Sequence, residues 1–446
     1  MRPYIVSLGV ASVAAAGLVA CVGDDSAVET PAPVSRDASF DATTSDAGSS
    51  GDAAADGAEG GGPVPPRLLL SFNTSPSSEL VALDLATGAV AGRNVYPATF
   101  GTTYARGSVP FLLEQSNDVV ARLDEREPWK ITSTWNVRGS DGRDGGPSYA
   151  DPAAVVASAG NKAYVLRFNR NAIFVIDPSE AADGGAPKKT IDLSPLVQAG
   201  DSDGVVEPVA AVYVASKKRL FVLADNIDLS KVASDGFTYL CSSLRSSVVA
   251  IDTDTDTVVS AGGTGPGGSI LLDVHNTPLG VDLVYDGVAD SLLVLGAGCN
   301  ADAGGGAAGP VTRRMVEEVA LGTGARTTRL DLSAAGFPLG FQYVSSSLAL
   351  IGFFGDLVVW DPRTTTLGPK VPGSFESFAY DGKGTVYGTR IVPKGDGGSA
   401  VEVAKTSIPS SAPDAAAPSV VVIATDPFAT SKGGGFLNGV EVWPRN

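Results

Sequence analysis

The 446-residue sequence has little of what nucleic-acid binding or histidine-based catalysis needs. It contains a single histidine, His275, and three cysteines. Its 32 lysines and arginines are outnumbered by 49 aspartates and glutamates, which gives a formal charge of −17. The basic residues form no cluster that could neutralise phosphates or hold an anionic membrane surface. We therefore expect no nucleic-acid partner.

Long amphipathic helices are also missing. With 54 glycines and 29 prolines, no window keeps a 3.6-residue apolar period over the length of a helix. Short runs of valine, leucine and isoleucine occur throughout the chain instead. This composition predicts an all-β protein, and all-β domains can reach this length as one domain.

The first 20 residues are typical of an export signal. Arg2 precedes an apolar stretch from Tyr4 to Ala20 that ends in small residues. A retained transmembrane helix is the weaker alternative, because the stretch is marginal for spanning a bilayer. Leu18-Val19-Ala20-Cys21 resembles the lipobox of bacterial lipoproteins. The resemblance implies a lipoprotein signal peptide over residues 1–20 and a lipid anchor, diacylglycerol and palmitate, on Cys21.

The segment that follows the signal differs in composition from the rest of the chain. Residues 21–66 consist largely of Asp, Ala, Ser, Gly and Pro, and residues 22–66 hold nine acids and one base. Such a composition cannot bury enough apolar surface to offset the loss of chain entropy. We expect a disordered, lipid-anchored acidic linker, followed by a folded body over residues 67–446 that carries about −10.

A repeat runs through this body. Apolar segments end in an aspartate that is followed by turn residues, and the aspartates are Asp84, Asp124, Asp177, Asp252 and Asp361. Degenerate copies occur near Gly322 and Lys405, which makes seven copies spaced about 40 to 75 residues apart. A second pattern of short strand, polar turn and apolar strand alternates with the first. Together they predict a seven-bladed β-propeller with four-stranded antiparallel blades.

These repeats resemble the YVTN-type β-propeller family of bacterial surface and envelope proteins. The copies at Ser247, SVVAIDTDTDTVV, and at Thr277, TPLGVDLVYDG, are the closest to the family's blade pattern. Because the body starts with a middle strand and ends with an inner one, we expect residues 437–443 to complete the blade built from residues 67–95.

The acidic series Asp252, Asp254 and Asp256 raises the question of a calcium loop. An EF-hand loop needs a glycine at its sixth place and a carboxylate at its twelfth, where this chain has Thr257 and Gly263. An aspartate at the first position of a turn accepts hydrogen bonds from the backbone two or three residues on. The pattern therefore favours a turn over a metal site.

Other candidate sites are weak. His275 lacks an assignable nucleophile and orienting acid, so we expect no catalytic residue. The glycine-rich segment at Gly263 lacks the lysine of a phosphate loop. Cys241 and Cys299 fall in corresponding loops of adjacent blades and could form a disulfide outside the cytoplasm, although two free thiols remain an alternative.

Long polar loops, which concentrate on one face of the expected propeller, are the best guide to a binding surface. These loops comprise residues 138–150, 194–206, 225–245, 261–277 and 297–313. The candidate binding residues on this face are Asp225, Asn226, Asp228, Tyr239, His275, Asn276, Arg313 and Arg314.

The sequence thus predicts a lipid-anchored cell-envelope propeller, in the outer membrane and facing the periplasm or the cell surface. We expect a non-catalytic monomer that binds an envelope protein or glycan and needs no metal or cofactor. The alternative is an envelope enzyme of propeller fold, either a calcium-dependent hydrolase or lactonase or a quinoprotein-like dehydrogenase. A third possibility is an assembly factor for outer-membrane barrels.

Overall fold

A computed structural model describes residues 63–73, 77–105, 107, 109–141, 148–158, 161–180, 183–228, 231, 233, 239–274, 282–302, 304, 308–394, 399–408, 418–428 and 436–444. The expected signal peptide, Cys21 and residues 21–62 of the expected linker lie outside the described residues. No helix within the described part of the chain is long and apolar enough to cross a membrane.

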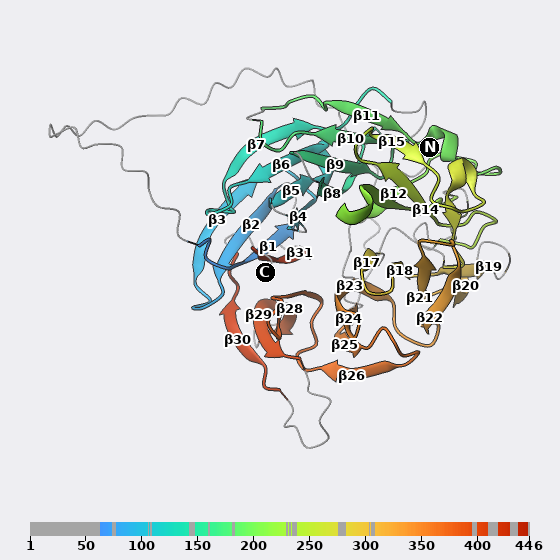
Figure 1. Ribbon diagram of the computed structural model, residues 1–446. Helices are drawn as coiled ribbons and strands as arrows, with labels where there is room; N and C mark the ends of the chain where they lie inside the picture. Colours follow the sequence, from blue (N-terminus) through green and yellow to red (C-terminus); the bar gives the residue numbers. More distant parts are fainter. Residues whose placement is uncertain are drawn as a thin grey trace, which may run out of the picture. The chain divides into compact units, whose positions relative to one another are not determined.

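The strands form seven antiparallel blades around a common axis (Figure 1). From the axis outward, blade 1 consists of β31 (Phe436–Trp443), β1 (Arg67–Asn73), β2 (Ser78–Asp84) and β3 (Val90–Tyr96). Blade 2 consists of β4 (Gly101–Tyr104), β5 (Phe111–Glu114), β6 (Val119–Leu123) and β7 (Ile131–Asn136). Blade 3 consists of β8 (Pro152–Ser158), β9 (Lys162–Arg167), β10 (Ala172–Ile176) and β11 (Lys189–Asp192).

The remaining blades follow the same order. Blade 4 consists of β12 (Pro208–Val214), β13 (Arg219–Ala224), β14 (Ser247–Asp252) and β15 (Thr257–Val259), with β16 (Ile270–Leu271) also paired to β14. Blade 5 consists of β17 (Asp282–Asp286), β18 (Ser291–Gly296), β21 (Met315–Ala320) and β22 (Arg326–Asp331). Blade 6 consists of β23 (Pro338–Ser345), β24 (Leu348–Phe353), β25 (Asp356–Trp360) and β26 (Leu367–Val371). Blade 7 consists of β27 (Ser377–Tyr380), β28 (Thr385–Pro393), β29 (Ser399–Ser407) and β30 (Val421–Thr425).

A few short elements lie outside the blades. The strands β19 (Cys299–Asp302) and β20 (Ala308–Thr312) form a separate hairpin between β18 and β21. The 3-10 helices are η1 (Gln115–Asn117), η2 (Ser194–Leu196), η3 (Ala215–Lys217) and η4 (Pro266–Gly268).

The seven blades and their four-stranded composition confirm the fold predicted from the repeats. The predicted closure is also confirmed, because β31 at the C-terminus pairs antiparallel with β1 near the start of the folded body. Arg67 lies opposite Trp443, and Leu69 lies opposite Glu441. Backbone hydrogen bonds between the first and last strands of the folded body therefore close the ring.

Apolar side chains pack mainly between neighbouring blades. The described residues form seven hydrophobic clusters, and each cluster joins side chains of two adjacent blades. The second and third strands are sandwiched in this way, so β9 and β10 are buried along almost their whole length. Outermost strands such as β22 face solvent and are largely polar. This explains why the middle strands appear in the sequence as continuous apolar runs.

The antiparallel order gives the ring two faces. The turns within each blade from first to second strand and from third to fourth strand lie on one face, which we call the turn face. The loops from second to third strand and those between blades lie on the other, which we call the loop face. The loop face carries the long segments that the sequence predicts.

Candidate binding face

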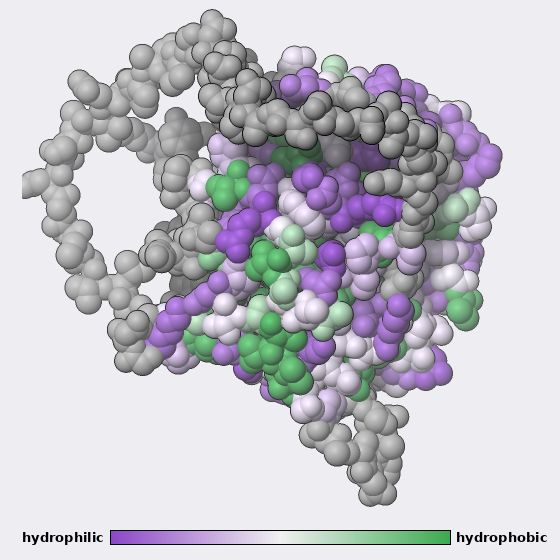
Figure 2. All heavy atoms as spheres, turned by 90° about the vertical axis from the view of Figure 1, so that its left-hand side faces the viewer, coloured by the Kyte–Doolittle hydropathy of each residue, from purple (hydrophilic) through white to green (hydrophobic). Residues whose placement is uncertain are grey.

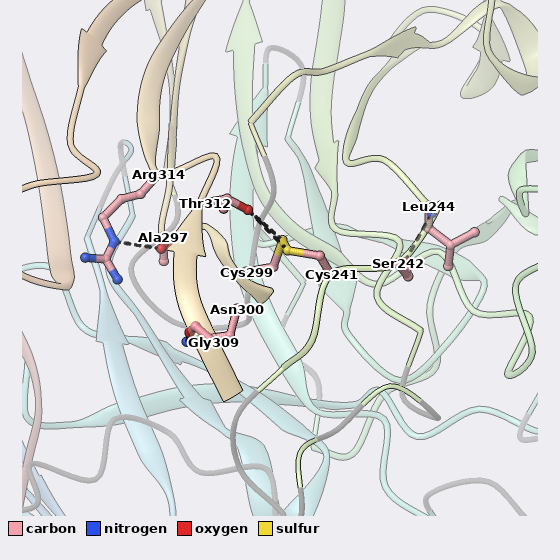
Figure 3. Close-up of a disulfide and its surroundings, with 9 residues drawn as sticks. All are labelled: Cys241, Ser242, Leu244, Ala297, Cys299, Asn300, Gly309, Thr312 and Arg314. Atoms are coloured by element: carbon pink, nitrogen blue, oxygen red, sulfur yellow. Dashed lines mark hydrogen bonds between the residues drawn. A yellow bond between two sulfur atoms is a disulfide. The ribbon is translucent and has the colours of Figure 1, made fainter. Parts of the chain in front are cut away.

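Two loops of adjacent blades are joined into one structure on the loop face. Cys241, between β13 and β14 of blade 4, forms a disulfide with Cys299 in β19 of blade 5, with an S–S distance of 1.95 Å and a Cα–Cα distance of 5.1 Å (Figure 3). The structure therefore contains the disulfide that the sequence predicts. We call residues 239–242, 299–302 and 308–312 the platform.

Backbone hydrogen bonds reinforce the disulfide. The Cys241 amide donates to the Asn300 carbonyl at 2.8 Å, and the Asn300 amide donates to the Tyr239 carbonyl at 3.0 Å. On its other side β19 pairs with β20, and the Asn300 side chain donates to the Gly309 carbonyl at 2.9 Å. The platform is thus a small cross-linked sheet built from two blades.

Arg314 fixes the base of the platform. It follows β20, and its Nε donates to the Ala297 carbonyl at 2.9 Å (Figure 3). Its Nη1 donates to the Ala335 carbonyl at 2.9 Å, in the loop that leads to blade 6. The guanidinium also lies 5.6 Å from the ring centroid of Phe337. Burial lowers the pKa of Arg314, and the side chain connects the platform to the next blade.

Buried or half-buried polar side chains hold other inter-blade loops in a similar way. Asp118, after η1, accepts the Ala150 amide at 2.6 Å and pairs with Arg138 Nε at 2.7 Å. Asn171, between β9 and β10, accepts the Val206 amide at 2.8 Å. In each case the residue in one blade orders the loop that leads into the following blade.

A buried arginine supports the loop after blade 2. Arg167 at the end of β9 is fully buried, and it forms a two-point ion pair with Asp141 at 2.8 and 2.5 Å. Its guanidinium lies 3.6 Å from the ring centroid of Phe174. Although burial opposes ionisation of Asp141, its contacts with Arg167 outweigh that effect, and its pKa is lowered. No sequence pattern indicated this role, because the pair joins residues 26 positions apart.

Several carboxyl groups lie close together beneath the loop face of blade 4. Burial and the neighbouring Asp203 raise the pKa of Glu207 well above its usual value. Burial likewise raises the pKa of Asp201 to about 6, and Asp203 adds to this effect. One Glu207 oxygen accepts the Ile227 amide at 3.0 Å. These acids help to order the loop of residues 201–207. As the pH rises they become ionised, and burial together with mutual repulsion of the carboxylates then destabilises the loop.

Tyr239 of the platform adjoins this acidic group. Burial raises the pKa of its phenol to about 12, and the charges of Asp225 and Glu207 act in the same direction. The hydroxyl therefore stays protonated at neutral pH. Half-buried Tyr239 thus lies within electrostatic reach of the acidic group.

The structure divides the eight predicted binding residues into three groups. Four of the residues are buried and support the loops: Asp225, Asn226, Asp228 and Arg314. The expectation that these four offer atoms to a binding partner is therefore wrong. Tyr239 is half-buried and Arg313 is exposed, and both lie at the platform. His275 and Asn276 lie outside the described residues. Sequence reasoning missed Asn300, for which the adjacent Cys299 was the only signal.

The acidic series in blade 4 lies on the turn face and forms a turn, as predicted. Asp252 Oδ1 accepts the amides of Asp254 and Thr255 at 3.0 and 2.9 Å. Asp254 pairs with Lys218 at 2.8 Å. Asp256 receives Lys162 at 3.0 Å and the hydroxyl of Tyr164 at 2.7 Å, both from blade 3. The three carboxylates therefore make contacts within the protein itself.

Two further observations concern possible ligands. Among the described residues, no group of three or more His, Cys, Asp or Glu side chains is placed to hold a metal ion. A shallow hollow of about 490 Å³ lies beside the turn of blade 2, and its lining includes Val64, Arg122 and Glu125.

The comparisons with known proteins identify the fold only. No family model and no curated protein matches the sequence. A functionally unknown protein from Desulfotomaculum acetoxidans is 9% identical, with a TM-score of 0.51 over 83% of this chain and 98% of that chain.

Two solved structures with named activities are less similar. A candidate 6-phosphogluconolactonase from Bacteroides fragilis is 10% identical, with a TM-score of 0.47 over 85% of this chain and 98% of that chain. A dihydro-heme d1 dehydrogenase is 13% identical, with a TM-score of 0.37 over 76% and 70%. Because both TM-scores lie below 0.5, neither activity is carried over to this chain.

Proposed function

We propose that this chain is a lipid-anchored protein of the bacterial cell envelope, related to the YVTN-type propellers, whose ring is a non-catalytic binding or scaffold module. Cys21 carries the lipid, and the acidic linker holds the propeller away from the bilayer. The lipobox-like sequence and the blade repeats support this part of the proposal. The partner is another protein or a glycan of the envelope.

The platform is the observation that carries the proposal. Most loops between the strands of a propeller need only reverse the chain, whereas the loop between β18 and β21 contains a hairpin of its own. A disulfide and two backbone hydrogen bonds then join that hairpin to a loop of the neighbouring blade. Neither feature is needed to complete blade 4 or blade 5, since both have four strands without it.

Rigidity is what a binding surface gains from such links. A loop that is ordered before binding loses less conformational entropy when a partner is bound. Exposed polar side chains here include Asp302 of the platform and Arg313, which directly follows the platform, and Tyr239 is half-buried. Tyrosine and arginine are enriched at protein interfaces, and adaptable polar groups around them provide specificity.

A cross-linking experiment in intact cells tests the position of the binding surface. A photoreactive amino acid is placed at Asp302 on the platform or, as a control, at Asp254 on the turn face, where the side chain is 61% exposed. We expect an adduct with a discrete partner from position 302 and none from position 254. Adducts only from position 254 would place the binding surface on the other face.

The anchor requires a separate test. Mass spectrometry of the membrane-bound protein should find diacylglycerol on Cys21, and Cys21→Ser should release the protein from the membrane fraction. An intact leader in the wild-type protein would refute lipid anchoring, and it would leave the platform proposal unaffected.

A further inference from the structure

The outermost strand of blade 7 has an edge without charged residues. Strand β30 pairs with β29 on one side, and no described strand pairs with its other side. No charged residue occurs from Pro418 to Thr425, a segment rich in valine and isoleucine. Val421 and Val422 are 46% and 42% exposed. Free strand edges of this kind readily pair with another strand, so proteins usually block them.

The other six outermost strands are blocked or short. A charged residue lies within β3, β11, β22 and β26: Arg93, Lys189, Arg326 and Lys370, respectively. The edge of β7 is covered, because the Gly185 amide donates to the Thr134 carbonyl at 3.2 Å. Strand β15 has only three residues. The pairing of β29 with β30 contains a register shift. The pairings of β3, β7, β22 and β26 contain one too, so this feature does not distinguish β30 from the other outermost strands.

The exposed valines extend into an apolar patch on the side of the ring where blades 7 and 1 meet. Val90 of β3 is 38% exposed. A Cβ atom at Gly88, two residues before Val90, would lie 2.2 Å from the Ile423 carbonyl, so the two blades are in close contact there. Figure 2 shows the side on which β3 and β30 lie in Figure 1, with hydrophobic side chains gathered among polar ones.

We propose that β30 pairs with β30 of a second copy of this chain, to form a two-fold symmetric dimer. Pairing of a strand edge with an added strand is a common mode of protein recognition, and a symmetric pair uses the same patch on both subunits. This proposal goes beyond the binding role of the platform, and it proposes a dimer in place of the monomer that we expected from the sequence.

Charge favours a second copy as the occupant. The folded body carries about −10, so most contacts between two copies bring like charges together. The β30 edge avoids this repulsion because it has no charge. In an antiparallel pair centred on Val422, which leaves the Ile423 carbonyl against Gly88, Val421 lies opposite Ile423 of the other copy, and Asp426 lies opposite Pro418. No two acids then face each other across the interface.

The test uses the full chain in detergent micelles and measures its mass by sedimentation as a function of concentration. Val422→Lys places a charge on the free edge, and Val288→Lys is the matched control, since Val288 is 84% exposed in a turn of blade 5. We expect wild type and Val288→Lys to dimerise equally, and Val422→Lys to dimerise at least about tenfold more weakly. Val422→Thr, which keeps a β-branched and uncharged side chain, should dimerise like wild type.

Two results would overturn the proposal. One is a wild-type chain that stays monomeric up to about 100 μM; capture of a strand from a different protein would then be the remaining use of the edge. The other is a Val422→Lys variant that dimerises as well as wild type, which would place the contact elsewhere. Circular dichroism of each variant confirms that the exposed substitutions leave the fold intact.

Discussion

At the residue scale, one aspartate per repeat sets the turn between the third and fourth strands. In all five clear repeats, an Oδ1 atom accepts the backbone amide two residues on, as Asp84 accepts Ala86 and Asp177 accepts Ser179. Hydrogen bonds to the carboxylate stabilise its charged form. The bond from Thr255 lowers the pKa of Asp252 to about 2, and the pKa of Asp84 is lowered for the same reason.

Replacement of one such aspartate tests this role. Asp84 accepts the amides of Ala86 and Thr87 at 3.0 and 2.9 Å and pairs with Arg67. We expect Asp84→Ala to lower the free energy of unfolding by about 1 kcal/mol in urea titrations at pH 7. Asp84→Asn keeps the accepting oxygen and should retain most of that stability. The effect of Asp84→Ala should shrink as the pH falls below the ordinary aspartate pKa of 3.8, because the wild-type carboxylate then becomes protonated. Equal losses for both variants would contradict the turn role.

The acidic group of blade 4 predicts the opposite pH dependence. The pKa of Asp201 is about 6 in the folded protein against an ordinary 3.8, so the folded state holds its proton more tightly than the unfolded chain. The associated stability is complete below about pH 4 and is lost as the pH rises through 6. After allowance for partial exposure, we expect a loss of about 1 kcal/mol.

Asp201→Asn should flatten this dependence. Its free energy of unfolding should change less than that of wild type between pH 4 and pH 7, in chemical denaturation at fixed ionic strength. The lowered pKa of Asp84 affects stability only at lower pH. If the free energy of unfolding changed equally in wild type and in Asp201→Asn between pH 4 and pH 7, the raised pKa of Asp201 would be contradicted.

Apart from the disulfide between Cys241 and Cys299, residue roles were predictable from sequence only where both partners are close in the chain. The role of the turn aspartates was predictable, because each carboxylate and its amide donors lie within three residues of each other in the chain. The role of Asp118 was not, since its partner Ala150 is 32 residues away and is brought near only by the ring. Asp225 and Arg314 were correctly assigned to loops, but whether a loop residue is buried depends on what folds over it.

At the element scale, the loops differ from the strands in how the sequence specifies them. The second and third strands are buried on both sides, so their apolar runs predict them directly. The hairpin β19–β20 was missed, because its sequence is rich in alanine and glycine and has no apolar alternation. Its pairing depends on long-range links, above all the disulfide to Cys241.

Removal of the disulfide should weaken the protein and loosen the platform. The bond closes a separation of 58 residues, which corresponds to roughly 4 kcal/mol on the chain-entropy model. We expect the Cys241→Ser, Cys299→Ser double variant to lose stability of that order in denaturant titrations. Faster amide hydrogen exchange should be confined to residues 239–242 and 299–312. Unchanged exchange there would mean that hydrogen bonds alone hold the platform.

At the scale of the whole molecule, the C-terminal strand closes the ring. Strand β31 supplies the inner strand of blade 1, and Trp443 is buried against the interface with blade 2. Its indole Nε1 donates to the Glu125 carbonyl at 2.9 Å. This closure was predictable from the order of strand patterns at the two ends, because a ring of complete blades leaves no other place for a lone inner strand.

Truncation of the Trp443 side chain tests the closure. We expect Trp443→Ala to cost roughly 3 to 5 kcal/mol, because a large buried ring and its hydrogen bond are lost at the closing blade. Trp443→Phe should recover most of this loss. Thermal unfolding followed by circular dichroism gives the comparison. Variants that unfold at the wild-type temperature would show that β31 is not needed to hold the ring.

The central claim is that binding takes place on the disulfide-linked platform. The most direct measurement is the yield of partner cross-linked from position 302 in intact cells, with the disulfide present and in the Cys241→Ser, Cys299→Ser variant. We expect a discrete adduct in the first case and a yield at least about tenfold lower in the second, since a loosened platform pays more entropy on binding. Equal yields, or adducts only from position 254, would contradict the claim.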